Sequence, residues 1–164
     1  MPDRVIVLVE DNANDEELTL RAFRKSNIVN RVVVVRDGAE ALDYFFARGA
    51  HADRSPNEIA QVVLLDLKLP KIDGLDVLRA LRADERTKLI PIVVLTSSAE
   101  EQDLVRSYEL GVNAYVVKPM KYQDFVEAVK QVSGFWAVIN EVPESLRRGE
   151  TASGTHASKA GVLA

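Results

Sequence analysis

Cysteine is absent from this chain of 164 residues. The chain therefore cannot form a disulfide, a zinc–thiolate site or a thiolate nucleophile. Long apolar runs are absent too, since a membrane helix needs roughly 20 consecutive apolar residues and the runs here are only a few residues long. Residues 1–4 do not have the layout of a signal peptide, because the apolar stretch at 5–9 is short and leads directly into acids. We expect a cytoplasmic protein with no membrane partner.

A concentrated positive charge is also missing. Lysine and arginine total 21 against 25 acidic residues, which gives a net charge of -4. Because binding to a nucleic-acid backbone needs a concentrated basic face, DNA is disfavoured as a partner. No glycine-rich fingerprint follows the first apolar run, which disfavours a dinucleotide-binding domain. The composition, 47% apolar and 28% charged, is that of an ordinary globular domain.

Five short apolar runs alternate with segments that have helical periodicity. The runs cover residues 5–9, 32–35, 62–65, 92–95 and 114–117. Continuous runs of this length are typical of strands that are buried on both faces of a parallel sheet. A first helix is expected at about 15–26, and apolar residues at helical spacing follow each later run. The alternation predicts an α/β fold with a doubly wound, five-stranded parallel sheet.

The domain is expected to cover residues 1–140, with a long surface loop at 48–60. Residues 141–164 are interpreted as a C-terminal extension. Its last part, 151–164, is small and polar without periodicity, and we interpret it as a flexible tail. The whole extension, about 24 residues, is too short to build a core of its own.

The last helical segment has the clearest apolar stripe. The stripe consists of Tyr122, Phe125, Val126, Val129, Val132, Trp136 and Ile139, and a neighbouring face carries Phe135, Val138 and Val142. Either the tail folds over this neighbouring face or the face forms a subunit interface. We expect a homodimer formed through the fourth helix (around 104–108), the fifth strand (114–117) and the last helix.

Polar residues that can carry chemistry follow the apolar runs. Glu10 and Asp11 come after the first run, Asp66 after the third, Thr96 after the fourth and Lys118 after the fifth. The carboxyl ends of parallel strands share one edge of the sheet, where doubly wound folds place their sites. We therefore expect three carboxylates, a hydroxyl and an ammonium to converge.

Taken singly, each of these residues has an ordinary structural explanation. An acidic pair after a strand is often a solvated turn or a helix cap, and Asp66 alone would suggest a turn. The hydroxyls of 96–98 could cap a helix, and an isolated lysine usually lies on the surface. The joint occurrence of these residues, each immediately after a strand, favours a site.

Such a set supports phosphoryl transfer. Clustered carboxylates favour a divalent cation with oxygen ligands, Mg²⁺ first and Mn²⁺ as a substitute. A carboxylate beside that ion can attack phosphorus and form an acyl phosphate. Lys118 and the ion would neutralise the phosphoryl charge, and the Thr96 hydroxyl would donate to one oxygen. A carboxylate is already ionised, so no histidine base is needed.

Four segments resemble the receiver domains of two-component response regulators, the CheY-like family. They are residues 9–12, 65–74, 95–97 and 115–119, and the resemblance covers roughly 3–140. It implies the strand order 2-1-3-4-5. It also implies that a sensor histidine kinase phosphorylates Asp66. The same resemblance implies that Asp11 and Asp66 bind Mg²⁺ directly, with the backbone carbonyl of Lys68 as a third ligand and Glu10 acting directly or through water.

The resemblance also implies a switch. Lys118 would pair first with the carboxylate and then with the phosphoryl group, and the Lys118–Pro119 peptide would be cis. Thr96 would move toward the phosphoryl group and Tyr115 would swing inward behind it. The change would reach the surface of the fourth helix, fifth strand and last helix. Output would be protein–protein contact, because nothing after residue 140 resembles a DNA-binding domain or an output enzyme.

A second resemblance concerns the subgroup. The loop at 48–60 and residues 135–143 are similar to those of single-domain regulators paired with phytochrome-type sensor kinases. Lys68, two residues after Asp66, would lie at the entrance to the phosphoryl site and influence the lifetime of the phosphoryl group.

Two alternatives stay open. The first is a phosphorylation-independent binding module of the same fold. The second is a Mg²⁺-dependent phosphatase with an aspartyl-phosphate intermediate. Such enzymes commonly carry a second acid two residues after the nucleophile, where this chain has Lys68. We therefore expect a signalling domain and no independent enzymatic activity.

Overall fold

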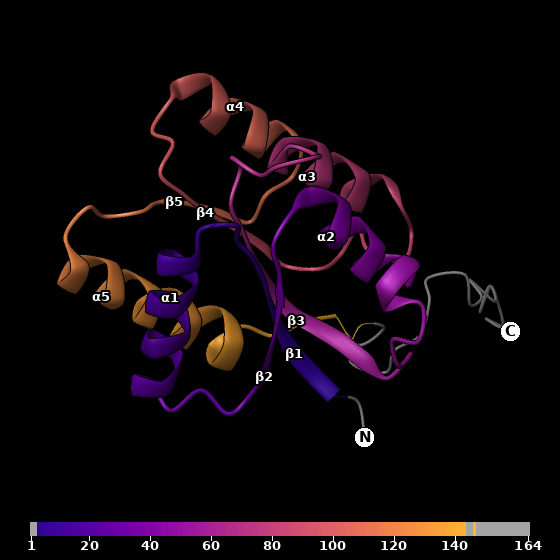
Figure 1. Cartoon of the computed structure of the whole chain (residues 1–164), viewed down its shortest axis with the longest axis horizontal. Coiled ribbons are helices and arrows are strands. Elements are labelled where there is room, and N and C mark those ends of the chain that lie inside the picture. Colours follow the sequence, from indigo (N-terminus) through magenta and orange to yellow (C-terminus); the bar gives the residue numbers. More distant parts are fainter. Residues whose placement is uncertain (1–2, 144–145, 147–164) are drawn as a thin grey trace, which may run out of the picture.

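The computed structural model describes residues 3–143 and 146. Five parallel strands form one sheet in the order β2-β1-β3-β4-β5, which confirms the fold class and strand order expected from the sequence (Figure 1). The strands are β1 (Asp3–Val9), β2 (Arg31–Val35), β3 (Glu58–Leu65), β4 (Ile92–Thr96) and β5 (Ala114–Val117).

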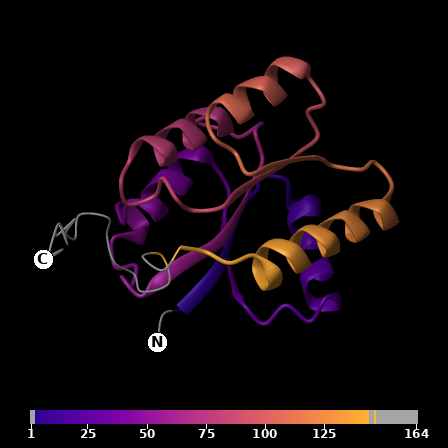
Figure 2. The ribbon, with the colours of Figure 1, turned by 180° about the vertical axis from the view of Figure 1, so that it is seen from behind.

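Helices cover both faces of the sheet. One face carries α1 (Ala13–Lys25) and α5 (Tyr122–Ser133), and the other carries α2 (Gly38–Phe45), α3 (Gly74–Ala83) and α4 (Glu101–Glu109), as Figures 1 and 2 show from opposite sides. Successive strand side chains point to opposite faces. Accordingly, Val5 and Val7 of β1 pack in the core beneath α2 and α3, whereas Ile6 and Leu8 pack in the core beneath α1 and α5. This double burial explains why the strands have unbroken apolar sequences.

The segment before β3 differs from the expected loop at 48–60. It contains a short 3-10 helix, Gly49–His51, and ends at 57, because β3 begins at Glu58. The first residues of β3 pair with the start of β1, with Glu58 opposite Asp3. Polar residues at 58 and 61 interrupt the apolar pattern, so the sequence indicates only the second half of this strand.

The apolar stripe predicted for the last helix is wrong at both of its ends. Tyr122 and Ile139 are exposed, the latter by 67%, whereas Val142 is buried at 3%. After Ser133 the backbone continues as a π-helix, Gly134–Ile139. Its wider i→i+5 turns change which side chains face the sheet, so a 3.6-residue period no longer applies. Phe135 and Val138 of the neighbouring face are exposed among the described residues, whereas Val142 of the same predicted face is buried.

No helix in the described ranges is long and apolar enough to cross a membrane. The tail expected at 151–164 lies outside the described residues. Leu146, which is described, packs against the core on the side of α2 and α3.

Candidate functional site

The structure brings the polar residues at the carboxyl edge of the sheet together. Lys118 Nζ lies 2.9 Å from Asp66 Oδ2 and 2.6 Å from Glu10 Oε2. The Thr96 hydroxyl donates to Asp66 Oδ1 at 2.9 Å. The residues that follow β1, β3 and β5 and the last residue of β4 therefore form one polar cluster, as their positions in the sequence predict.

A fourth carboxylate belongs to this cluster. Lys118 Nζ also lies 2.8 Å from Asp15 Oδ2. Asp15 is in the first turn of α1, where its backbone N–H donates to the side chain of the N-cap residue Asn12 at 3.0 Å. The sequence marked Asp15 only as the start of a helix. Its position, four residues after Asp11 and on the turn that follows the site, is the signal that could have identified it.

The cluster is largely removed from solvent. Asp66 is 6% exposed, Glu10 is 2% exposed, and the Lys118 side chain is 7% exposed. Burial raises the pKa of Glu10 to about 7, although its hydrogen bond to Lys118 acts in the opposite direction. Burial also opposes the charged form of Lys118, but hydrogen bonds to Asp15, Asp66 and Glu10 outweigh it and raise the pKa of the ammonium above its usual value. One ammonium thus holds three carboxylates together.

The acidic residues fit a divalent cation. Glu10, Asp11 and Asp66 each offer a carboxylate oxygen, and these oxygens lie within 4.8 Å of one another. Asp11 is exposed and accessible to an ion. The backbone N–H of Lys68 donates to Asp66 Oδ1 at 3.2 Å, so the Lys68 backbone adjoins the same carboxylate. A donor set made of oxygen atoms suits Mg²⁺ or Mn²⁺.

The peptide bond between Lys118 and Pro119 requires a correction. The expected cis peptide is wrong, because every peptide bond in the described part of the chain is trans. A trans X–Pro bond is favoured by about 0.5–1 kcal/mol when nothing in the surroundings selects the other isomer. The Lys118 ammonium reaches all three carboxylates from the trans backbone.

The two residues expected to form a switch are linked through Ser98. The Tyr115 hydroxyl donates to the Ser98 carbonyl oxygen at 2.8 Å, and the Ser98 N–H donates to Thr96 Oγ1 at 3.3 Å. Burial raises the pKa of the half-buried Tyr115 phenol. Ser98 is not the N-cap of α4, a position that Glu100 occupies.

Lys68 and Asp103 form an ion pair that the sequence does not indicate. Lys68 Nζ lies 3.4 Å from Asp103 Oδ2, and the Ser98 hydroxyl donates to the same oxygen at 2.6 Å. Asp103 belongs to the first turn of α4 and is almost fully buried. This ion pair connects the loop after Asp66 to α4.

The start of α3 has no room for a side chain at Gly74. Asp73 is the N-cap, and its side chain accepts from the Leu75 N–H at 3.3 Å. A Cβ atom at Gly74 would overlap the backbone carbonyl oxygen of Asp66 and the Cα of Leu67. The helix can therefore approach the strand end only where position 74 has no side chain.

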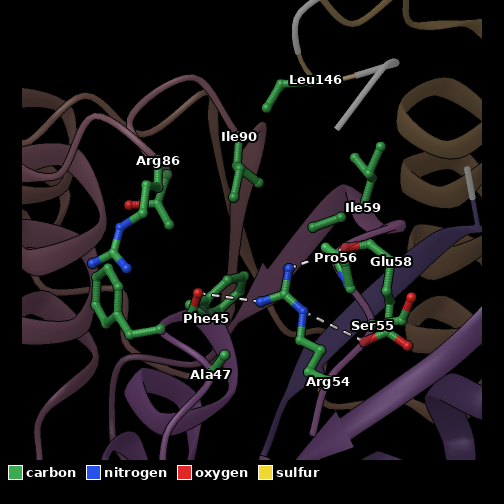
Figure 3. Close-up of a pocket in the computed structure, with 13 residues that line it drawn as sticks. Phe45, Ala47, Arg54, Ser55, Pro56, Glu58, Ile59, Arg86, Ile90 and Leu146 are labelled. Carbon is green, nitrogen blue, oxygen red and sulfur yellow. Dashed lines mark hydrogen bonds and ion pairs between the residues drawn. The ribbon is translucent and has the colours of Figure 1, made fainter. Parts of the chain in front are cut away.

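A cavity of about 260 Å³ lies at the other end of the sheet (Figure 3). It is lined by Phe45, Ile59, Ile90 and Leu146, with the Arg54 guanidinium pointing into it. Ile59 and Asp66 are at opposite ends of β3, roughly 23 Å apart at the usual rise of a strand. The cavity is thus separate from the polar cluster.

A parallel sheet of this order, with an acidic cluster, a hydroxyl and a lysine at its carboxyl edge, defines the class of CheY-like signalling domains. Residues 6–130 match the family described as response regulator receiver domain. The chain belongs to this family.

The chain is similar to three response regulators, Rcp1, RcpA and AtBRR. Response regulator Rcp1 of Synechocystis sp. is 38% identical over 135 residues, which cover 82% of this chain and 90% of Rcp1. The crystal structure of Rcp1 in its Mn²⁺-bound form matches with a TM-score of 0.78 at 36% identity, covering 85% of this chain and 98% of that one.

The other two relatives are also solved structures. The phosphorylated cyanobacterial phytochrome response regulator RcpA matches with a TM-score of 0.80 at 38% identity, covering 87% of this chain and 99% of RcpA. The bacteriophytochrome response regulator AtBRR is 55% identical with a TM-score of 0.67, covering 84% of this chain and 98% of AtBRR.

Proposed function

We propose that this receiver domain accepts a phosphoryl group on Asp66 from a sensor histidine kinase in a Mg²⁺-dependent reaction and signals by protein–protein contact. One observation carries the proposal. The buried Asp66 carboxylate is held by the Thr96 hydroxyl and the Lys118 ammonium, beside two further acids that can hold a cation.

The residues have separate roles in the transfer. An Asp66 carboxylate oxygen attacks phosphorus, the P–O bond of the acyl phosphate forms, and the P–N bond to the kinase histidine breaks. Thr96 and Lys118 orient the carboxylate beforehand and then donate to phosphoryl oxygens. Glu10, Asp11, Asp66 and the Lys68 backbone carbonyl would hold Mg²⁺ or Mn²⁺, which when bound supplies positive charge to the phosphoryl oxygens.

The switch follows from the same contacts. Thr96 now donates to Asp66, and Tyr115 is bound to the Ser98 carbonyl. A phosphoryl group on Asp66 would draw the Thr96 hydroxyl toward it, and Tyr115 would turn inward behind Thr96. The β4–α4 loop is the bistable element that these two residues bias.

Two kinds of partner fit this proposal. The similarity to RcpA and AtBRR supports a phytochrome-type sensor kinase as the phosphoryl donor. A homodimer through α4, β5 and α5 is supported by exposed apolar side chains on those elements, namely Val105, Tyr108, Val117 and Tyr122. A single concentration-independent monomer mass in both phosphorylation states would contradict the dimer.

The test is direct phosphorylation. Wild type and Asp66→Asn are incubated with acetyl phosphate and Mg²⁺, and intact masses are recorded. We expect one phosphoryl adduct on wild type, lost when EDTA is added before the donor, and none on Asp66→Asn. Absence of the adduct with acetyl phosphate and with a panel of histidine kinases would instead favour the phosphorylation-independent binding module. Steady turnover of small phosphate esters would favour the phosphatase.

A further inference from the structure

Asp103 connects three segments around the site. It belongs to α4, its Oδ2 accepts from the Ser98 hydroxyl of the β4–α4 loop at 2.6 Å, and the same oxygen lies 3.4 Å from Lys68 Nζ of the β3–α3 loop. The Asp103 side chain is only 12% exposed, whereas the Lys68 side chain is 58% exposed. A fixed, buried carboxylate therefore holds a movable ammonium.

We infer that Asp103 is a positioning residue that competes with the phosphoryl group on Asp66 for the Lys68 ammonium. The inference rests on the proposed function and deepens it. It assigns to Asp103 the control of how long the phosphoryl group survives and of how firmly α4 is tied to the site.

Lys68 is close enough to pair with either Asp103 or a phosphoryl group on Asp66. Its backbone N–H donates to Asp66 Oδ1 at 3.2 Å, so the root of its side chain adjoins the phosphorylated position. A lysine side chain has a flexible four-carbon stem, so its terminal ammonium can move between nearby partners. A phosphoryl group carries a charge of about -1.5 to -2 at pH 7, against -1 for a carboxylate. Phosphorylation of Asp66 thus favours transfer of the ammonium from Asp103 to the phosphoryl oxygens.

The transfer has a consequence at α4. The Ser98 hydroxyl, and with it the Lys68 ammonium, holds the pKa of Asp103 below its usual value. When Lys68 leaves, Asp103 keeps the Ser98 hydroxyl and the weaker attraction of Arg106 but loses its ion pair. Loss of that ion pair destabilises the buried carboxylate in its present position. The Ser98 carbonyl oxygen also accepts from the Tyr115 hydroxyl, so the β4–α4 loop is in contact with both Tyr115 and Asp103.

The transfer also affects hydrolysis. An ammonium on the phosphoryl oxygens covers the solvent-facing side of the group, from which water must attack in line. Asp103 holds the ammonium back and so shortens the lifetime of the phosphoryl group. Removing the Asp103 charge is expected to lengthen that lifetime, and only when Lys68 is present.

The test is a double-mutant cycle on the hydrolysis rate. Wild type, Asp103→Asn, Lys68→Ala and the double variant are phosphorylated with acetyl phosphate and Mg²⁺, the donor is removed, and loss of the adduct is followed by intact mass. We expect hydrolysis about two- to fivefold slower in Asp103→Asn, the range for a partly exposed ion pair. We expect faster hydrolysis in Lys68→Ala and the same rate in the double variant as in Lys68→Ala.

Asp76→Asn is the matched control, because Asp76 forms an exposed ion pair with Arg79 on α3, whereas the ion pair of Lys68 is with Asp103. Equal lifetimes in Asp103→Asn and wild type would overturn the inference. So would an effect of Asp103→Asn that is unchanged in the Lys68→Ala background, since Asp103 would then act through the fold alone. Should Asp103→Asn not fold, equal rates in wild type and Lys68→Ala would overturn it independently. Failure of wild type to form an adduct with acetyl phosphate and with the panel of histidine kinases would contradict the proposed function itself, and an adduct with no effect of Asp103 would contradict only this inference.

Discussion

Lys118 and Asp15 lie 2.8 Å apart at Nζ and Oδ2, although 103 positions separate them in the sequence. This ion pair gives Lys118 a third carboxylate in addition to Asp66 and Glu10. Asp15 is not among the acids whose oxygens cluster for a cation. It therefore adds negative charge beside Asp66, the proposed phosphoryl acceptor, and shares the Lys118 ammonium with it.

We predict that Asp15→Asn accelerates phosphorylation of Asp66 by acetyl phosphate. Removing one negative charge lowers the repulsion of an anionic donor and frees part of the Lys118 ammonium, which is worth a rate increase of about two- to tenfold near a protein surface. The rate of adduct formation is measured by intact mass at several salt concentrations.

Glu17→Gln is the control, because Glu17 is exposed on the same helix and pairs with Arg21. It makes the same change in charge away from the cluster and should have little effect. Slower uptake in Asp15→Asn would mean instead that Asp15 holds Lys118 in its productive position.

Gly74→Ala is predicted to damage both stability and phosphorylation. The added methyl would overlap the Asp66 carbonyl oxygen, so α3 or the strand end must shift. Overpacking of this kind costs about 1–3 kcal/mol. Urea unfolding measures the loss, and the yield of the Asp66 adduct measures the displacement of the carboxylate.

Gly134→Ala is a control for Gly74→Ala, because nothing lies within 4 Å of a Cβ at that position. In a helical backbone this change should stabilise by up to about 1 kcal/mol or be neutral. Equal unfolding free energies in the two variants would contradict the overlap.

Arg54→Ala is predicted to destabilise the fold without altering phosphorylation. The guanidinium donates to the carbonyl oxygens of Tyr44, Phe45 and Glu58 and lies over the Tyr44 ring. Loss of this partly buried guanidinium removes three hydrogen bonds to carbonyl oxygens, of which only that of Tyr44 is known to keep a backbone donor, the Ala47 N–H, and this should cost about 2–4 kcal/mol. Urea unfolding and the adduct yield are measured together.

Arg48→Ala is the comparison for Arg54→Ala, because Arg48 is an exposed arginine of the same segment whose ion-pair distance to Asp43 is 3.7 Å. Its loss should change the unfolding free energy by less than about 1 kcal/mol. A similar loss in the two arginine variants would mean that the carbonyl bonds of Arg54 contribute little.

Asp37 is predicted to make the stability of α2 depend on pH. Its side chain accepts from the Glu40 N–H at 2.7 Å as the N-cap, and this bond, with help from Lys71, lowers its pKa. A carboxyl whose folded pKa is lowered stabilises the fold above its unfolded pKa, 3.8 here, and loses that contribution as the pH falls through the folded value. Asp37→Ala should cost about 1 kcal/mol at pH 7.

The pH dependence is checked by unfolding wild type and Asp37→Asn between neutral and strongly acidic pH. Asparagine keeps a capping oxygen but does not titrate, so the difference between the two curves should shrink below the unfolded pKa. A constant difference across that range would show that the charge of Asp37 does not contribute.

The main outline of the fold and site could be predicted because both depend on local patterns. Doubly buried strands require unbroken apolar runs, and the residue that follows each run must lie at the shared edge, as Asp66 and Lys118 do. The contacts of Asp15 and Asp103 could not be predicted, since each depends on how a helix packs beside the edge. Ile139 was misplaced because a π-helix changes the periodicity on which the prediction relied.

The double burial of β1 has a consequence for how the chain tolerates changes in length. The strand runs directly into Glu10 and Asp11, and its alternating side chains fill the two cores on either side of the sheet. Deleting one residue from β1 would exchange the two sets of side chains and turn the acidic pair away from Lys118. The segment before Glu58 has no such constraint, because it lies at the far end of β3. Insertions and fused sequences are therefore best placed at that end, where they do not change the strand register that brings the acidic pair to Lys118.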